Sequence, residues 1–249
     1  AISAALPQVN GKVLAMIHGL CMNDLRWQRQ TDAGTHDHGA ALQHDLGYTT
    51  VYLRYNTGLH VSENGRQLAR ELESLLAAWP VPVKSLSIVT HSMGGLVARS
   101  ACHYGSAAKL AWRSKLKKLV FIGTPHTGAP LERGGHWITS LLGSTPYAAP
   151  MARLGKLRSS GITDLRHGSV LDEDWLGRDR FVSGASTIHP LPLPADVDCY
   201  AIAGTSGKRD DDMSSRVLGD GLVPLASALG QHDDPERALS FPQGHTVIV

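Results

Sequence analysis

The sequence predicts an α/β protein in which a mostly parallel β-sheet is covered by helices on both faces. Short hydrophobic segments typical of strands alternate with segments that have helical periodicity. Residues able to take part in catalysis come directly after several strand-like segments, where parallel sheets bind their ligands. The chain of 249 residues is 42% hydrophobic and 18% charged, which suits one domain with a large core. We therefore expect residues 1–249 to form a single domain.

The first strand is expected at Lys12–Ile17, because this run is short, apolar and followed at once by His18 and Gly19. A glycine there lets the backbone turn an N–H group toward a site at the end of the strand. A polar loop and a helix follow. The histidines and aspartates at positions 36–38, 44 and 45 match no metal-ligand spacing, so we interpret them as the polar start of that helix.

The next strand is expected at Thr49–Arg54 and the next helix at Glu63–Trp79. Leucines and a tryptophan recur along one face of this helix, which is typical of a helix packed on a sheet. Pro80 and Pro82 end it, because proline lacks the N–H group that a continuing helix requires.

The most informative segment is SIVTHSMGGLVAR at positions 87–99. A hydrophobic strand stops at Ser92 and a helix-forming stretch begins at once, which is the layout of a nucleophile elbow. Such a turn raises the serine hydroxyl above the sheet, and Gly94 and Gly95 let the helix pass close to the strand. The usual pattern is G-x-S-x-G, and here Thr90 stands at its first position. The alternative is an ordinary strand-to-helix turn with an incidental serine.

A further strand is expected at Lys117–Ile122, and residues 126–197 then interrupt the alternation. This long stretch contains no clear strand, and its apolar residues cluster around Trp137, Leu141 and Tyr147. We interpret it as a cap or lid whose apolar side chains form the rim of an acyl pocket, because loops of this length are usually functional or disordered. A long surface excursion packed for stability is the alternative.

The candidate acid is Asp220, which stands between two glycines after the strand expected at Asp198–Ala203. Its carboxylate could orient a histidine ring and stabilise the cationic form of that ring. A turn aspartate bonded to its own backbone is the alternative. The order of serine, aspartate and then histidine is that of α/β-hydrolases.

The candidate base is His245, which follows Gly244 near the end of the sequence. Two interpretations remain open. Either Ala238–Phe241 is the last strand and His245 is the base, or Thr246–Val249 is the last strand and the base lies beyond Val249. Because the triad histidine of this architecture should follow the last strand, the choice depends on where that strand lies.

Four segments of the chain, IHGLCMND, THSMGG, VFIGTPHTGAP and GDGLVP, together resemble those of bacterial lipases and esterases. These are α/β-hydrolases, and the resemblance includes lipase-like hydrolases related to GPI inositol deacylases. It extends from about residue 12 to about residue 225 and implies the α/β-hydrolase fold with a cap or lid. It also implies a Ser-Asp-His esterase with Ser92 as nucleophile and Asp220 as acid, whereas His126 would be a structural loop residue.

The resemblance implies that the backbone N–H groups of Leu20 and Met93 form an oxyanion hole. We expect the substrate to contact His18, Gly19 and His91 near these positions, and also Trp137 and Leu141 of the expected cap. The chemistry requires no cofactor. The acidic runs at 172–174 and 210–212 are interpreted as solvated loops, and no metal site is expected.

We therefore expect a serine hydrolase that cleaves small-molecule, lipid or polymeric esters through an acyl-enzyme intermediate. An acyltransferase with the same triad and a non-catalytic binding protein of the same fold are the alternatives. A formal net charge of +2 does not suggest a nucleic-acid partner, and no apolar run is long enough to span a membrane. The three cysteines predict no disulfide framework. We expect a soluble protein, in the bacterial cytoplasm or secreted; compartment and oligomeric state stay open.

Overall fold

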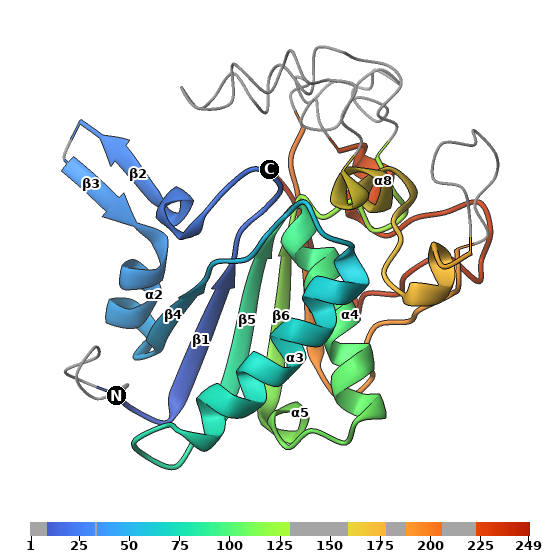
Figure 1. Cartoon of the computed structure of the whole chain (residues 1–249). Coiled ribbons are helices and arrows are strands. Elements are labelled where there is room, and N and C mark those ends of the chain that lie inside the picture. The colour runs from blue at the N-terminus through green and yellow to red at the C-terminus, as the bar shows by residue number, and fades with distance from the viewer. Residues whose placement is uncertain (1–8, 33, 130–158, 178–187, 206–222) are drawn as a thin grey trace.

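A six-stranded sheet forms the centre of the molecule, in the order β4-β1-β5-β6-β7-β8 (Figure 1). This computed structural model describes residues 9–32, 34–129, 159–177, 188–205 and 223–249. Every pair of neighbouring strands in the sheet is parallel. The predicted α/β fold with a mostly parallel sheet is therefore confirmed.

The strands of the sheet follow the apolar runs of the sequence. They are β1 (Lys12–Ile17), β4 (Thr49–Leu53), β5 (Ser85–His91), β6 (Leu116–Ile122), β7 (Asp198–Ala203) and β8 (Thr246–Ile248). The last of these fixes the final strand of the described chain, because Thr246–Ile248 is a strand and Ala238–Phe241 is not.

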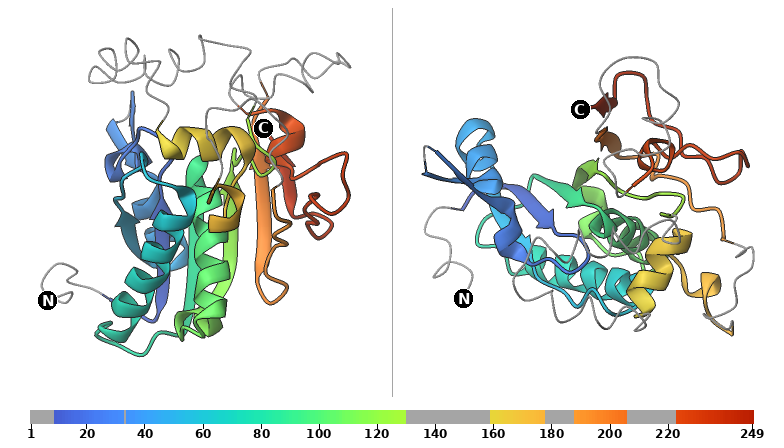
Figure 2. Two further views of the ribbon diagram at one scale, coloured as in Figure 1. Left: turned by 45° about the vertical axis from the view of Figure 1, so that its right-hand side comes forward. Right: turned by 90° about the horizontal axis from the view of Figure 1, so that it is seen from above.

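Helices lie on both faces of the sheet. The helical elements are η1 (Asp24–Trp27), α2 (His38–Leu46), α3 (Val61–Ala77), α4 (Met93–Ala107), α5 (Trp112–Lys115), α8 (Ser160–His167), η3 (Asp172–Asp174) and α10 (Leu225–Ala228). In Figure 1, α3 and α4 lie in front of the sheet, and the view from above in Figure 2 shows α2 on the opposite side.

β1 contributes to two hydrophobic clusters because side chains alternate along a strand. Val13, Ala15 and Ile17 of β1 belong to the large cluster packed with α3 and α4. Leu14 and Met16 point the other way, into a smaller cluster with Trp27. The expected leucine face of α3 is confirmed by the burial of its inward side chains.

A two-stranded hairpin of β2 (Gln28–Thr31) and β3 (Gly34–Asp37) stands outside the main sheet. The sequence did not predict it, because its side chains are polar and almost all exposed, so no hydrophobic alternation marks its strands. The expected polar helix start is confirmed at Asp37, whose side chain caps α2 by accepting a hydrogen bond from the Ala40 N–H, whereas His44 and Asp45 lie at the other end of this helix.

The described part of the expected cap contains α8, which lies across the upper ends of α3 and α4 (Figure 2). Asp164 of α8 is buried and accepts hydrogen bonds from the Val61 N–H at 2.7 Å and from His60 Nδ1 at 3.0 Å. Asp174 is also buried and accepts from the backbone N–H groups of Val170, Leu171 and His189. The expectation of a solvated acidic loop at 172–174 is therefore wrong for Asp174, whose carboxylate closes a turn.

Candidate active site

The candidate site lies where the strand order changes direction. β1 has β4 on one side and β5 on the other. The chain therefore first adds a strand on one side of β1 and then continues the sheet on the other side, beginning with β5. The loop after β1 and the turn after β5 consequently meet at the carboxyl ends of two adjacent strands. Open parallel sheets bind ligands at such a switch point.

Ser92 occupies the sharp turn between β5 and α4. Its backbone has φ 51° and ψ −125°, which is a strained conformation for a residue with a side chain. The Ser92 N–H donates to the Ile122 carbonyl at 2.8 Å, and the Ser92 carbonyl accepts from the Gly95 N–H at 3.0 Å. These bonds hold the strain in place, and an elbow that displays a nucleophile has this arrangement.

Three glycines allow the backbone segments around Ser92 to approach closely. A Cβ on Gly94 would lie 2.6 Å from the His18 carbonyl oxygen, and one on Gly95 would lie 2.1 Å from Thr124 Oγ1. A Cβ on Gly19 would lie 3.1 Å from Ser92 Cβ. The structure therefore brings the Gly19 loop directly against Ser92.

Thr90 explains its place in the elbow pattern. The side chain is fully buried, and its hydroxyl donates to the Val120 carbonyl on β6 at 3.0 Å. Threonine therefore replaces the usual glycine without leaving a polar atom unpaired.

The His18 side chain lies beneath the loop that it begins. It is 1% exposed, and its ring stacks on the Tyr55 ring at 4.5 Å between centroids. His18 Nδ1 lies 2.9 Å from the Gly19 carbonyl oxygen, and because a carbonyl only accepts, Nδ1 carries the proton. Burial lowers the pKa of His18, which favours the neutral ring.

Met93 is the first residue of α4, and its N–H group belongs to the positive end of the helix. The side chain is fully buried, and a Cβ on Gly161 of α8 would lie 2.9 Å from Met93 Cε. Helix α8 therefore packs on the residue that follows Ser92. His91 is partly buried, and its Nδ1 lies near Gly19.

Three of the predicted site residues, Asp220, Trp137 and Leu141, lie outside the described residues. Their roles stay predictions.

The structure does not bring His245 and Ser92 together. His245 precedes β8, and its Nδ1 donates to the Cys199 carbonyl on β7 at 3.1 Å while its ring stacks on Tyr200. β8 and β5 are separated by β6 and β7, so three strand spacings, about 14 Å, lie between them. In a catalytic triad, the Nδ1–H group of the histidine donates a hydrogen bond to the aspartate. In His245 this group donates to the Cys199 carbonyl instead.

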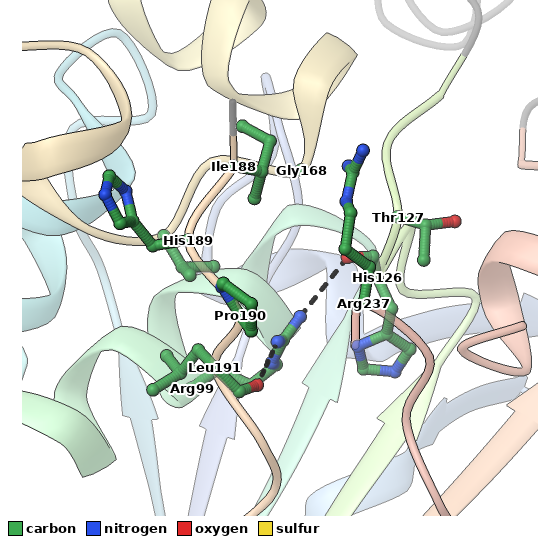
Figure 3. A pocket seen from close by; sticks show the side chains of 10 residues that line it. Arg99, His126, Thr127, Gly168, Ile188, His189, Pro190, Leu191 and Arg237 are labelled. Atoms are coloured by element: carbon green, nitrogen blue, oxygen red, sulfur yellow. Dashed lines mark hydrogen bonds between the residues drawn. The ribbon is translucent and has the colours of Figure 1, made fainter. Parts of the chain in front are cut away.

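The sequence did not single out a role for Arg99 or for Tyr55. The Arg99 guanidinium on α4 donates to the Leu191 carbonyl at 2.6 Å and to the His126 carbonyl at 3.3 Å (Figure 3). Tyr55, directly after β4, contacts the loop of His18. An aromatic residue that follows a strand at the ligand-binding edge was the signal that could have pointed to Tyr55. His126 is buried, as its interpretation as a structural residue requires.

The described residues contain no group of three or more histidine, cysteine, aspartate or glutamate side chains placed to hold a metal ion. Over the same parts of the chain, none of the helices combines the length and the apolar character needed to cross a bilayer. Cys21, Cys102 and Cys199 are all free thiols.

Comparison with known proteins gives one family match. The family described as "PGAP1-like alpha/beta domain" matches residues 8–191. No curated protein matches the sequence significantly.

Solved structures share the fold. The mature lipase BlEst2 of Bacillus licheniformis has a TM-score of 0.55 and 15% identity, covering 98% of this chain and 87% of the lipase. Phospholipase PlaB of Legionella pneumophila has a TM-score of 0.52 and 18% identity, with coverages of 87% and 45%. Lipase B of Aspergillus fumigatus has a TM-score of 0.51 and 12% identity, with coverages of 95% and 43%. The chain thus spans less than half of the last two proteins, and identities this low show the fold alone.

Proposed function

Because the chain belongs to the family of the PGAP1-like alpha/beta domain, we propose that it is a serine hydrolase that cleaves carboxylic esters. The observation that carries this proposal is the strained backbone of Ser92, held between β5 and α4 and against Gly19. A non-glycine residue at φ 51° costs free energy, and such strain persists where it serves function.

In the proposed reaction, Ser92 Oγ forms a bond with the ester carbonyl carbon while a general base takes the hydroxyl proton. The tetrahedral intermediate then collapses, the bond to the alcohol oxygen breaks, and the base returns the proton to the leaving alcohol. Water repeats the sequence on the acyl-enzyme and releases the acid. The N–H groups of Leu20 and Met93 stabilise the negative oxygen in both halves.

Asp220 is the proposed acid that orients the base. For the base itself, the position of β8 favours a histidine that follows this strand over His245. This is the second of the two interpretations open from the sequence, and it agrees with the three strand spacings between β8 and Ser92.

The proposed substrates are small-molecule, lipid or polymeric esters. Gly19 and His91 border Ser92, and Trp137 and Leu141 are the proposed apolar rim of the acyl pocket. A series of chromogenic esters of increasing acyl length would define the preference. Polar substitutions of Trp137 and Leu141 that left the whole profile unchanged would remove these two residues from the pocket.

The nucleophile is tested with Ser92→Ala in the full-length protein. We expect ester hydrolysis to fall on the order of 10⁴-fold or more, because the reaction loses its covalent route. The wild-type protein should form a single phosphonate adduct, located on Ser92 by peptide mass spectrometry. Ser106→Ala, at an exposed position of the same helix, is the matched control and should keep full activity. An adduct on another residue, or an active Ser92→Ala variant, would refute the proposal.

A further inference from the structure

We infer that Tyr55 and Thr57, on the loop after β4, are positioning residues that fix the direction of the Leu20 N–H group. The inference rests on the proposed function, in which this N–H stabilises the oxyanion. Neither residue touches the reacting atoms in this scheme. Both act on the backbone of the loop that carries Leu20, one on each side of it.

On the N-terminal side of Leu20, the Tyr55 hydroxyl donates to the His18 carbonyl oxygen at 2.8 Å. The same oxygen lies against Gly94 of the elbow, where a Cβ would approach it to 2.6 Å. The His18 carbonyl is therefore held between the Tyr55 hydroxyl and Gly94 of α4. The peptide plane between His18 and Gly19 consequently has little freedom to rotate.

The Tyr55 ring controls the next peptide plane through His18. It stacks on the imidazole at 4.5 Å with 20° between the ring planes. The imidazole in turn donates from Nδ1 to the Gly19 carbonyl oxygen at 2.9 Å, and the Met22 N–H donates to the same oxygen at 3.3 Å. In a trans peptide the C=O and N–H groups point in opposite directions. Holding the Gly19 carbonyl therefore sets the direction of the Leu20 N–H.

On the C-terminal side of Leu20, the Cys21 N–H donates to Thr57 Oγ1 at 3.3 Å. Cys21 has φ 54°, a left-handed conformation that a residue with a side chain rarely adopts. The hydrogen bond that Cys21 donates to Thr57 supports this turn. Leu20 is thus bracketed by two anchors that come from one three-residue segment of the β4–α3 loop.

The chemistry of Tyr55 suits a permanent donor. Burial raises the pKa of the Tyr55 phenol above its ordinary value, so the hydroxyl keeps its proton throughout the range in which esterases are assayed. The role therefore depends on geometry and not on titration.

The test measures kcat and KM of full-length Tyr55→Phe and Thr57→Val with a chromogenic short-chain ester. Phenylalanine keeps the stacking on His18 and loses only the hydroxyl, and valine keeps the shape of threonine. We expect kcat to fall about 10- to 100-fold with KM within about twofold, because a misdirected donor weakens binding of the transition state more than binding of the substrate. The affinity for a trifluoromethyl ketone, which forms the tetrahedral oxyanion adduct, should fall in parallel with kcat.

The matched control is Tyr52→Phe, on β4. Its hydroxyl also has a hydrogen-bond partner, Asp37 at 2.5 Å, but that partner lies at the start of α2, away from the elbow. Tyr52→Phe should keep wild-type kcat even if it lowers the unfolding midpoint.

A wild-type kcat in both Tyr55→Phe and Thr57→Val, or a loss that appears only in KM or equally in Tyr52→Phe, would overturn the inference. Phosphonate labelling of Ser92 separates this result from a failure of the proposed function. Labelled Ser92 with unaffected variants contradicts only the positioning role, whereas unlabelled Ser92 contradicts both.

Discussion

The buried side chain of His126 makes the free energy of unfolding depend on pH. The residue is 4% exposed, and neither ring nitrogen has a hydrogen-bond partner in the described parts of the chain. Burial, with a smaller contribution from the Arg99 charge, lowers the pKa of His126 well below its ordinary value of 6.5. The folded protein therefore keeps the ring neutral, whereas the unfolded chain protonates it below about pH 6.5.

The sign of the effect follows from proton binding. Below about pH 6.5 the unfolded state binds more protons than the folded state, so the free energy of unfolding falls as the pH falls toward the lowered pKa. His18, whose pKa is also lowered by burial, contributes in the same direction.

We expect His126→Leu to make the loss of stability between about pH 7 and pH 5 shallower than in the wild-type protein. Leucine removes both unpaired ring nitrogens, so we also expect about 1 kcal/mol of added stability at neutral pH. Urea unfolding at several pH values measures both quantities. His36→Leu, at an exposed position of the hairpin, should leave the slope unchanged. An unchanged slope in His126→Leu would show that this ring does not contribute.

At the scale of elements, Arg99 joins α4, the helix that follows Ser92, to both ends of the proposed cap at residues 126–197. The guanidinium contacts the His126 carbonyl, where the region begins, and the Leu191 carbonyl near its end. Figure 3 shows it lying between these two segments. Burial lowers the pKa of Arg99 to about 10, so the group stays charged at neutral pH, and the Asp174 carboxylate offsets part of that shift.

Arg99→Met should lower the free energy of unfolding by about 3 kcal/mol or more, because it leaves two carbonyls unpaired and the buried Asp174 without its cationic neighbour. Arg99→Lys should recover only part of this loss, since an ammonium group lacks the planar fork that reaches both segments. Chemical denaturation compares these variants with Arg70→Met, an exposed position on α3. Equal stability of Arg99→Met and Arg70→Met would contradict the role of Arg99 in holding these two segments to α4.

At the scale of the whole molecule, the order of strands determines which residues can meet. The loops after β1 and β5 are adjacent because these strands are neighbours, so Gly19 and Ser92 come into contact. β8 lies at the edge of the sheet, and its register places His245 level with Tyr200, below the carboxyl end of β7. The sheet order therefore separates His245 from Ser92 although both belong to the predicted triad.

His245→Asn in the full-length protein should retain most of the proposed ester-hydrolysing activity. Asparagine can still donate to the Cys199 carbonyl, so the fold should be kept. Steady-state rates with a chromogenic ester, compared with Ser92→Ala, provide the measurement. A loss of activity as large as that of Ser92→Ala would restore His245 as the proposed base. His245 would then have to lie close to Ser92.

The sequence by itself determined the features that depend on neighbouring residues. β1 and β7 have the bounds expected from their apolar runs, and the elbow at Ser92 follows from a strand, a turn and two glycines in direct succession. These signals are local, since side-chain burial and backbone geometry are set within a few residues.

Only the tertiary structure decided which distant residues meet. The polar hairpin has no apolar alternation to reveal it, and the partner of His245 depends on the register between β7 and β8. The Tyr55 hydroxyl reaches a carbonyl 37 positions earlier, and Asp164 pairs with His60 across 104 positions. Such contacts depend on how strands and helices pack, because a hydrogen bond requires two groups to lie within about 3 Å in space and places no condition on their separation along the chain.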